Sequence, residues 1–74
     1  TTTIGDRLRR YRRRCKYSAE QLSRKIKNEH PDTALSRQVI SNIENNRRVE
    51  LTLHEIVALS QAMGIPPIAL IYDV

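Results

Sequence analysis

Apolar residues recur along the chain at the spacing of helical faces, in five short stretches. The stretch around which the others are organised is Leu35 to Arg48, LSRQVISNIENNRR, which predicts a helix of about three turns over roughly residues 36–46. Ile40 and Ile43 lie three residues apart, so one side of this helix is expected to pack inward. Ser36 is suited to cap its start, because a serine oxygen can accept a backbone N–H of the first turn.

The opposite side of this stretch carries side chains with forked or adaptable hydrogen-bonding groups. They are Arg37, Gln38, Ser41, Asn42 and Asn45. A face that is merely solvated would more often hold lysine and glutamate. Arginine can bond guanine, and glutamine or asparagine can bond adenine, through paired hydrogen bonds in the major groove. Taken alone, the pattern leaves open a base-reading face and an ordinary amphipathic helix.

Three further helix starts carry a capping box, in which serine or threonine is followed three residues later by an acid or amide. The pairs are Thr3 with Asp6, Ser18 with Gln21, and Thr52 with Glu55. They predict helices over about residues 4–15, 19–27 and 53–63. The polar residues 28–35, with a central proline, are expected to form a loop.

The ends of these helices are also marked in the sequence. Asn45 and Asn46 suit a left-handed stop after the third helix, and Gly64 suits the end of the fourth. Pro66 and Pro67 then suit the first turn of a last short helix, where a missing N–H costs nothing. The residues after them are apolar nearly all round. Three of these, Ile68, Ile71 and Tyr72, form a candidate dimer surface.

The bulk composition narrows the function classes. Seventy-four residues make a single domain, residues 1–74, either complete or a piece of a longer protein. One cysteine and two separated histidines give no metal site, and neither a phosphate loop nor a paired nucleophile and base is present, so no cofactor is implied and an enzyme is disfavoured. No apolar run is long enough for a membrane span, which makes the cytoplasm the default location.

Charge is distributed very unevenly along the chain. All thirteen lysines and arginines lie at or before Arg48, so residues 1–48 carry a net charge of about +8 and residues 49–74 one of about −3. Six of the arginines lie in the first helix and are expected to contact a polyanion. Nucleic acid and an anionic membrane surface both meet this requirement. The first helix, however, has no broad exposed apolar face for entering lipid.

The order of these elements resembles the phage-repressor, Cro-type (XRE-like) helix-turn-helix family over nearly the whole chain. The matching pieces are IGDRLRRYR, SAEQLSRKI, SRQVISNIENNRR and TLHEIVALSQAMGI. The resemblance implies an all-α, five-helix, lambda-repressor-like bundle with an extended loop between helices two and three. It also implies a phage or bacterial protein that binds double-stranded DNA, with the third helix in the major groove and the second across the backbone.

The resemblance also implies roles for particular residues. Base reading falls to Arg37, Gln38, Asn42 and Ser41. Phosphate contacts fall to Ser36, Asn45, Arg47 and Arg48, with Arg24 and Lys25 as further candidates on the second helix. Arg12 and Glu44 match a structural ion pair that orients the third helix. Asn45 is alternatively a simple helix cap.

Three departures from the family pattern affect these expectations. A glutamine that often touches phosphate at the start of helix two is replaced by Ala19, and the usual glycine before that helix is replaced by Lys16. The turn between helices two and three is about eight residues, against the usual three or four. The longer turn puts in question the angle between the two helices and the base contacts that depend on it.

The leading hypothesis is a sequence-specific, repressor-like transcriptional regulator that binds DNA as a homodimer. The alternative is a protein-interaction module, such as an antitoxin or coactivator, that uses the same fold and its apolar C-terminal helix. An RNA-binding role is disfavoured, because the three tyrosines are expected to be committed to packing and leave no platform for stacking single-stranded bases.

Overall fold

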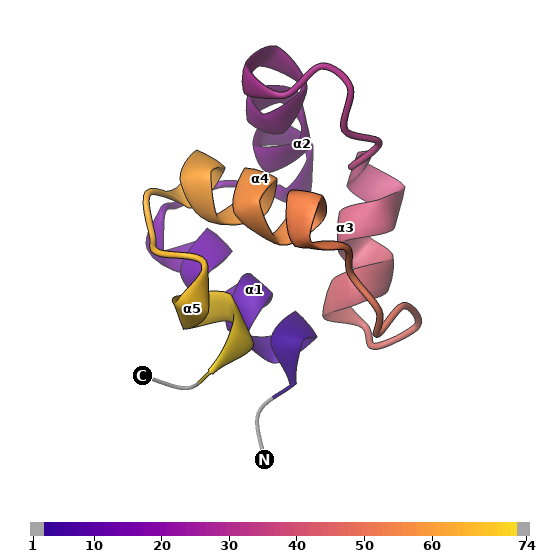
Figure 1. The fold of residues 1–74 in the computed structure, drawn as a ribbon, viewed down its shortest axis with the longest axis vertical. Coiled ribbons are helices and arrows are strands. Elements are labelled where there is room, and N and C mark those ends of the chain that lie inside the picture. The colour runs from indigo at the N-terminus through magenta and orange to yellow at the C-terminus, as the bar shows by residue number, and fades with distance from the viewer. Residues whose placement is uncertain (1–2, 73–74) are drawn as a thin grey trace.

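Between Thr3 and Tyr72, the part of the chain that this computed structural model describes, five helices follow one another (Figure 1). They are α1 (Ile4–Arg14), α2 (Ala19–Glu29), α3 (Arg37–Glu44), α4 (Leu53–Met63) and α5 (Ile68–Ile71). No strand occurs between these limits, and the predicted all-α, five-helix bundle is confirmed. In Figure 1, α4 crosses the centre, α2 lies above it, α3 to its right, and α1 and α5 below.

The helices begin where the capping patterns predict. The Thr3 hydroxyl accepts the N–H of Asp6 at 3.1 Å, and the Asp6 carboxylate accepts the N–H of Thr3 at 3.3 Å. Equivalent reciprocal boxes start α2 and α4. Ser36 caps α3 by accepting the N–H of Val39 at 3.3 Å. Local hydrogen bonds therefore define four of the five helix starts.

Three helices end at a residue in the left-handed conformation. Lys16, Asn46 and Gly64 have φ angles of 60°, 61° and 70° after α1, α3 and α4. In each case the N–H of the following residue bonds the carbonyl five positions back, as from Tyr17 to Arg12 at 3.2 Å. This is the Schellman arrangement, which satisfies carbonyls left open at a helix end. Lys16, which replaces the usual glycine, adopts this conformation with a Cβ and therefore carries backbone strain.

Several predicted boundaries need correction. Helix α3 has eight residues, about two turns rather than three. The N-cap residue Ser36 has an extended backbone conformation, and Asn46 turns the chain out of the helix. Helix α2 continues to Glu29 instead of ending near Lys27. It stops before Pro31, whose ring disfavours helical geometry at the preceding residue. Pro66 and Pro67 lie before α5, which is a single turn.

The core gathers side chains from every helix. Its members are Leu8, Tyr11, Leu22, Ile26, Leu35, Ile40, Ile43, Ala58, Leu59, Ala62, Met63, Ala69 and Leu70. Helix α2 packs on α3 and α4, and α1 packs on α3 and α5. Leu35 belongs to this core although the sequence places it in the loop, and it is only 3% exposed. The loop thus returns to the core immediately before α3.

Helices α1 and α3 approach each other most closely at Gly5. A Cβ placed on Gly5 would lie 2.1 Å from the carbonyl oxygen of Ile43 and 3.1 Å from the side-chain oxygen of Asn46. Because the nearer atom belongs to the backbone, it cannot move aside without moving the end of α3. Gly5 has an ordinary helical φ angle, so the backbone conformation does not require glycine here. The lack of space for a Cβ does.

We expect Gly5→Ala to lower the free energy of unfolding by about 1–3 kcal/mol, because overpacking against backbone outweighs the better helix propensity of alanine. Chemical denaturation measures the change. Arg13→Ala, at an exposed position of the same helix, is the control and should shift stability by less than about 0.5 kcal/mol. Unchanged or increased stability of Gly5→Ala would contradict the close approach.

Candidate nucleic-acid interface

Helix α3 is anchored on one side and open on the other. The side chains of Ile40 and Ile43 are fully buried, whereas Arg37 and Gln38 are exposed and Ser41 and Asn42 are partly exposed. The four residues expected to read bases therefore share the outward side of one helix. Arg37 has no hydrogen bond or ion pair to another residue in the described range, so its five N–H donors face solvent.

The polar side chains of this outward face hydrogen-bond one another. Gln38 donates through Nε2 to Oδ1 of Asn42 at 3.1 Å, and Asn45 donates through Nδ2 to the Ser41 hydroxyl at 3.3 Å. Both pairs are four residues apart on the helix. Gln38 and Asn45, the two donors of these pairs, each keep one further N–H for an outside partner. Side chains held in this way lose less freedom on binding than free ones.

The C-terminal end of α3 is tied to α1 through Glu44. This carboxylate is only 4% exposed and lies 2.6 Å from Nε of Arg12, with a second hydrogen bond of 2.8 Å from Nη2. The two parallel bonds make a bidentate pair, the strongest geometry for arginine and a carboxylate. Hydrogen bonding from Glu44 raises the pKa of Arg12, outweighing the opposite effect of burial. The ion pair that the resemblance implies is thus present.

Arg9 is a member of this cluster that sequence reasoning missed. Its Nε lies 3.3 Å from Glu44, and its Nη2 donates to the Asn45 side-chain oxygen at 2.9 Å. Arg9 precedes Arg12 by three residues, so the two lie on one side of α1, and this spacing was the available signal. Arg9 orients the side chain of Asn45, a residue expected at the phosphates.

The expected contact with a polyanion, from which Arg12 is set apart as a structural tie, is wrong for Arg7. Its side chain is buried, and it donates to the carbonyls of Leu70 at 2.7 Å and Ile71 at 2.9 Å, closing the end of α5. Arg9 and Arg12 are committed to Glu44. Of the six arginines of α1, only Arg10, Arg13 and Arg14 are exposed. Arg10 and Arg14 also stack over the ring of Tyr11.

The residues expected at phosphates differ in how they are held. Ser36, Asn45 and Arg47 are exposed at the two ends of α3. Arg48 forms an ion pair with Glu55 at 2.8 Å. Burial alone would raise the pKa of Glu55, but the hydrogen bonds from the Thr52 backbone N–H and from Arg48 hold it below its usual value.

On α2, Arg24 lies 3.3 Å from Glu20, and both side chains are at least half exposed. Lys25 donates to the Tyr17 hydroxyl at 3.0 Å. Neither cation is buried, so each can exchange its present partner for a phosphate at small cost.

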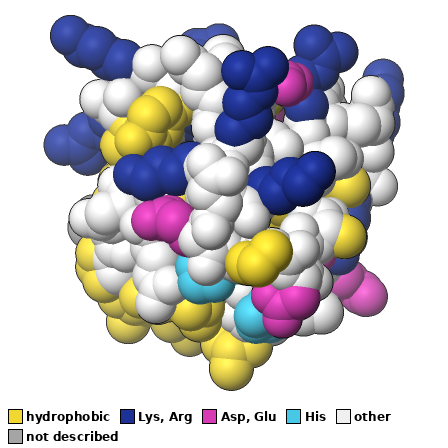
Figure 2. Space-filling model, turned by 90° about the horizontal axis from the view of Figure 1, so that it is seen from above, with side chains coloured by type: hydrophobic (Ala, Val, Ile, Leu, Met, Phe, Trp, Pro, Cys, Tyr) yellow, Lys and Arg dark blue, Asp and Glu magenta, His cyan; other side chains and the backbone are white. Residues whose placement is uncertain are grey.

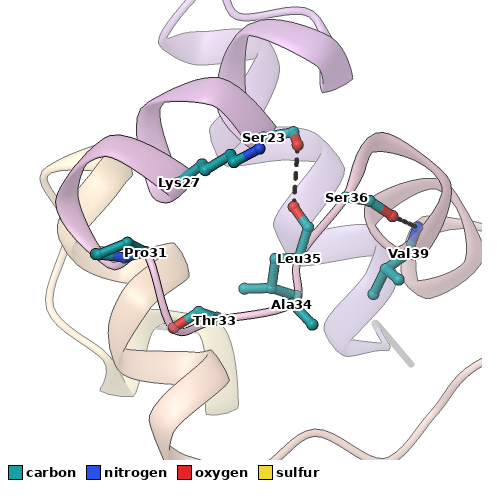
Figure 3. A pocket seen from close by; sticks show the side chains of 8 residues that line it. All are labelled: Ser23, Lys27, Pro31, Thr33, Ala34, Leu35, Ser36 and Val39. Carbon is teal, nitrogen blue, oxygen red and sulfur yellow. Dashed lines mark hydrogen bonds between the residues drawn. The ribbon is translucent and has the colours of Figure 1, made fainter.

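Two hollows flank the start of α3. One, of about 290 Å³, lies between the beginnings of α2 and α3 and is lined by Ser18, Ala19, Glu20, Arg37, Gln38 and Ser41. The other, of about 380 Å³, lies beneath the loop that joins α2 to α3 (Figure 3). In Figure 3, Ser23 of α2 bonds the carbonyl of Leu35 at 3.0 Å across this second hollow. That bond fastens the end of the loop to α2.

Basic side chains are not spread evenly over the surface. Figure 2 shows Lys and Arg concentrated in the upper half of the view, whereas hydrophobic side chains are exposed at its lower edge. The polarity of the sequence therefore becomes a polarity of the folded surface. Such a surface attracts a polyanion before any specific contact forms.

Comparison with known families agrees with this geometry. The profile of the helix-turn-helix family matches residues 8–70, which is most of the chain and includes α2, the loop and α3. The chain belongs to the helix-turn-helix family. It is of the Cro-type, XRE-like branch that the sequence resembles. This is a family of DNA-binding regulators of transcription and not an enzyme family.

The comparisons found no match among curated proteins and none among solved structures. Within residues 3–72, no helix is long and apolar enough to cross a membrane. The same residues contain no group of three or more His, Cys, Asp or Glu side chains placed to hold a metal ion.

We expect Glu44→Gln to lower the free energy of unfolding by about 2–3 kcal/mol, because it leaves the largely buried Arg12 guanidinium without a counter-charge. The same change should weaken DNA binding, since the end of α3 loses its tie to α1. Urea denaturation and DNA titration measure the two effects. Glu50→Gln is the control, because Glu50 is exposed in the α3–α4 loop. Equal effects of the two substitutions would argue against the tie.

Proposed function

We propose that this helix-turn-helix protein is a repressor-like transcriptional regulator that binds a specific double-stranded DNA sequence with α3 in the major groove. The observation that carries the proposal is the outward face of α3, where Arg37, Gln38, Ser41 and Asn42 present mostly uncharged hydrogen-bonding groups. An α-helix fits the width of the major groove, and these side chains match base edges there. Arg37 would bond guanine, and Gln38 and Asn42 would bond adenine.

Phosphate contacts at both ends of α3 would set its position in the groove. Ser36 lies before the first turn, and Asn45 and Arg47 lie after the last. Arg48, Arg24 and Lys25 would add charge at the edges of the contact. These contacts carry no sequence information but supply most of the affinity, and they make it depend on salt.

We further propose that the protein acts as a homodimer joined through α5. Ile68, Ile71 and Tyr72 are 52%, 41% and 62% exposed, which is unusual for three large apolar side chains close together. Helix α5 packs on α1 and α4, and in Figure 1 it lies near the end of α4 that is farther from α3.

The first experiment is selection of duplex DNA from a random pool at near-physiological salt. We expect a motif with two inverted half-sites, whose spacing reports the dimer geometry. Salt-sensitive binding without any motif would contradict sequence-specific recognition. A tight partner protein together with no selected motif would favour the alternative, an interaction module such as an antitoxin or coactivator that uses the exposed α5 surface.

Two alanine substitutions separate base reading from phosphate binding. Arg37→Ala should cost about 1–3 kcal/mol on the selected site and much less on a scrambled duplex, because a base contact is lost. Arg47→Ala should weaken both duplexes alike and reduce the salt slope by about 1. Fluorescence anisotropy titrations at several salt concentrations measure both. An equal loss on both duplexes for Arg37→Ala would refute its role in base reading.

A double substitution tests the dimer surface. Ile68→Ser with Ile71→Ser should shift sedimentation equilibrium toward monomer and weaken binding to the two-half-site operator at least about tenfold, since one half-site is then bound alone. Binding to an isolated half-site should be retained. The control is Val49→Ser with Leu53→Ser, which removes two apolar side chains outside α5 that are 68% and 72% exposed. A wild-type protein that is monomeric even on the operator would overturn the proposed dimer.

A further inference from the structure

Glu20 is the only acidic residue among those that line the hollow between the starts of α2 and α3. Helix α2 begins at Ala19, directly after its Ser18 cap. The side chain of Ala19 ends at Cβ, which leaves the space that a longer side chain would fill. Glu20 and Arg37 line this space from opposite helices, so a group entering it meets a carboxylate on one side and a guanidinium on the other.

Glu20 is free to change its present partner. Its side chain is 50% exposed, and it lies 3.3 Å from Arg24, which is 75% exposed. Exposed ion pairs of this kind, four residues apart on a helix, contribute little to stability. Arg37, across the hollow, has no bond to another described residue. Both charged groups can therefore be redirected toward a ligand.

Each of the two groups matches one half of the edge of a G·C base pair. In the major groove this pair offers two acceptors, N7 and O6 of guanine, and one donor, the N4 amino group of cytosine. Arginine supplies donors for the first two, and a carboxylate accepts from the third. An adenine also offers an amino donor, but its neighbouring N7 acceptor would face the carboxylate unfavourably. The acidic side chain thus discriminates by attraction to one base and repulsion from another.

We propose that Glu20 is a specificity-determining residue that accepts a hydrogen bond from the N4 amino group of a cytosine, in the base pair next to the one whose guanine is read by Arg37. The proposal rests on the major-groove binding proposed above and extends base reading from α3 to the start of α2. A carboxylate this close to the DNA also repels the phosphates. Any register of the protein on the DNA in which no base amino group faces Glu20 is therefore disfavoured.

The test is duplex selection with wild type, Glu20→Gln and Glu29→Gln, followed by titration of each on the selected sites. Glutamine keeps the length of glutamate but adds an N–H₂ donor, and so accepts adenine as well as cytosine. We expect Glu20→Gln to lose about tenfold in preference for cytosine at one position of each half-site, with the other positions unchanged. Glu29→Gln makes the same change of charge at the exposed far end of α2 and should select the wild-type motif. Thermal melting checks that all three proteins are folded.

The outcomes separate this proposal from the one on which it depends. A wild-type protein that selects no motif refutes major-groove reading itself. A wild-type motif that Glu20→Gln leaves intact, with tighter binding to every duplex, shows that Glu20 acts only through its charge and overturns the inference. The same change of motif in Glu29→Gln also overturns it, because the effect then follows from net charge and not from the place of Glu20. A change confined to Glu20→Gln and to one base position supports it.

Discussion

The structure depends first on how the end of α3 is fixed against α1. Two constraints act at this point, the bidentate bond from Arg12 to Glu44 at 2.6 and 2.8 Å and the approach of Gly5 to the carbonyl of Ile43. The first is electrostatic and directional, and the second is steric. Together they determine the distance between the two helices and the rotation of α3 about its axis. The outward direction of Arg37 and Gln38 follows from that rotation.

The same cluster explains how a chain rich in arginine folds without losing its basic surface. Arg7 closes the end of α5 and Arg9 and Arg12 share Glu44, so half of the arginines of α1 serve the structure. Each is paired with carbonyls or a carboxylate, as burial of a charge requires. Arg10, Arg13 and Arg14 remain at the surface. A count of charges in the sequence therefore overstates the charge that α1 can offer to DNA.

Local chemistry is what the sequence predicts well here. The capping boxes at Thr3, Ser18 and Thr52, and the left-handed ends at Asn46 and Gly64, involve residues within five positions of one another. The contacts that the residues alone did not reveal join distant positions. Arg7 reaches Leu70, and Arg9 reaches Asn45. Such pairs depend on how the helices pack, and no short pattern encodes them. The pair of Arg12 and Glu44 was found only because the family resemblance supplied the packing.

The long loop between α2 and α3 raised doubt about the angle between these helices, and its contacts explain why they still pack together. Leu35 is buried and its carbonyl accepts the Ser23 hydroxyl, so the chain is fastened to α2 immediately before α3 begins. Earlier in the loop, Thr33 bonds His54 of α4 at 2.7 Å. The extra residues are thus held toward α4, while Arg37 and Gln38 remain exposed. Because the loop is fastened at both Thr33 and Leu35, its extra residues leave α3 packed against α2.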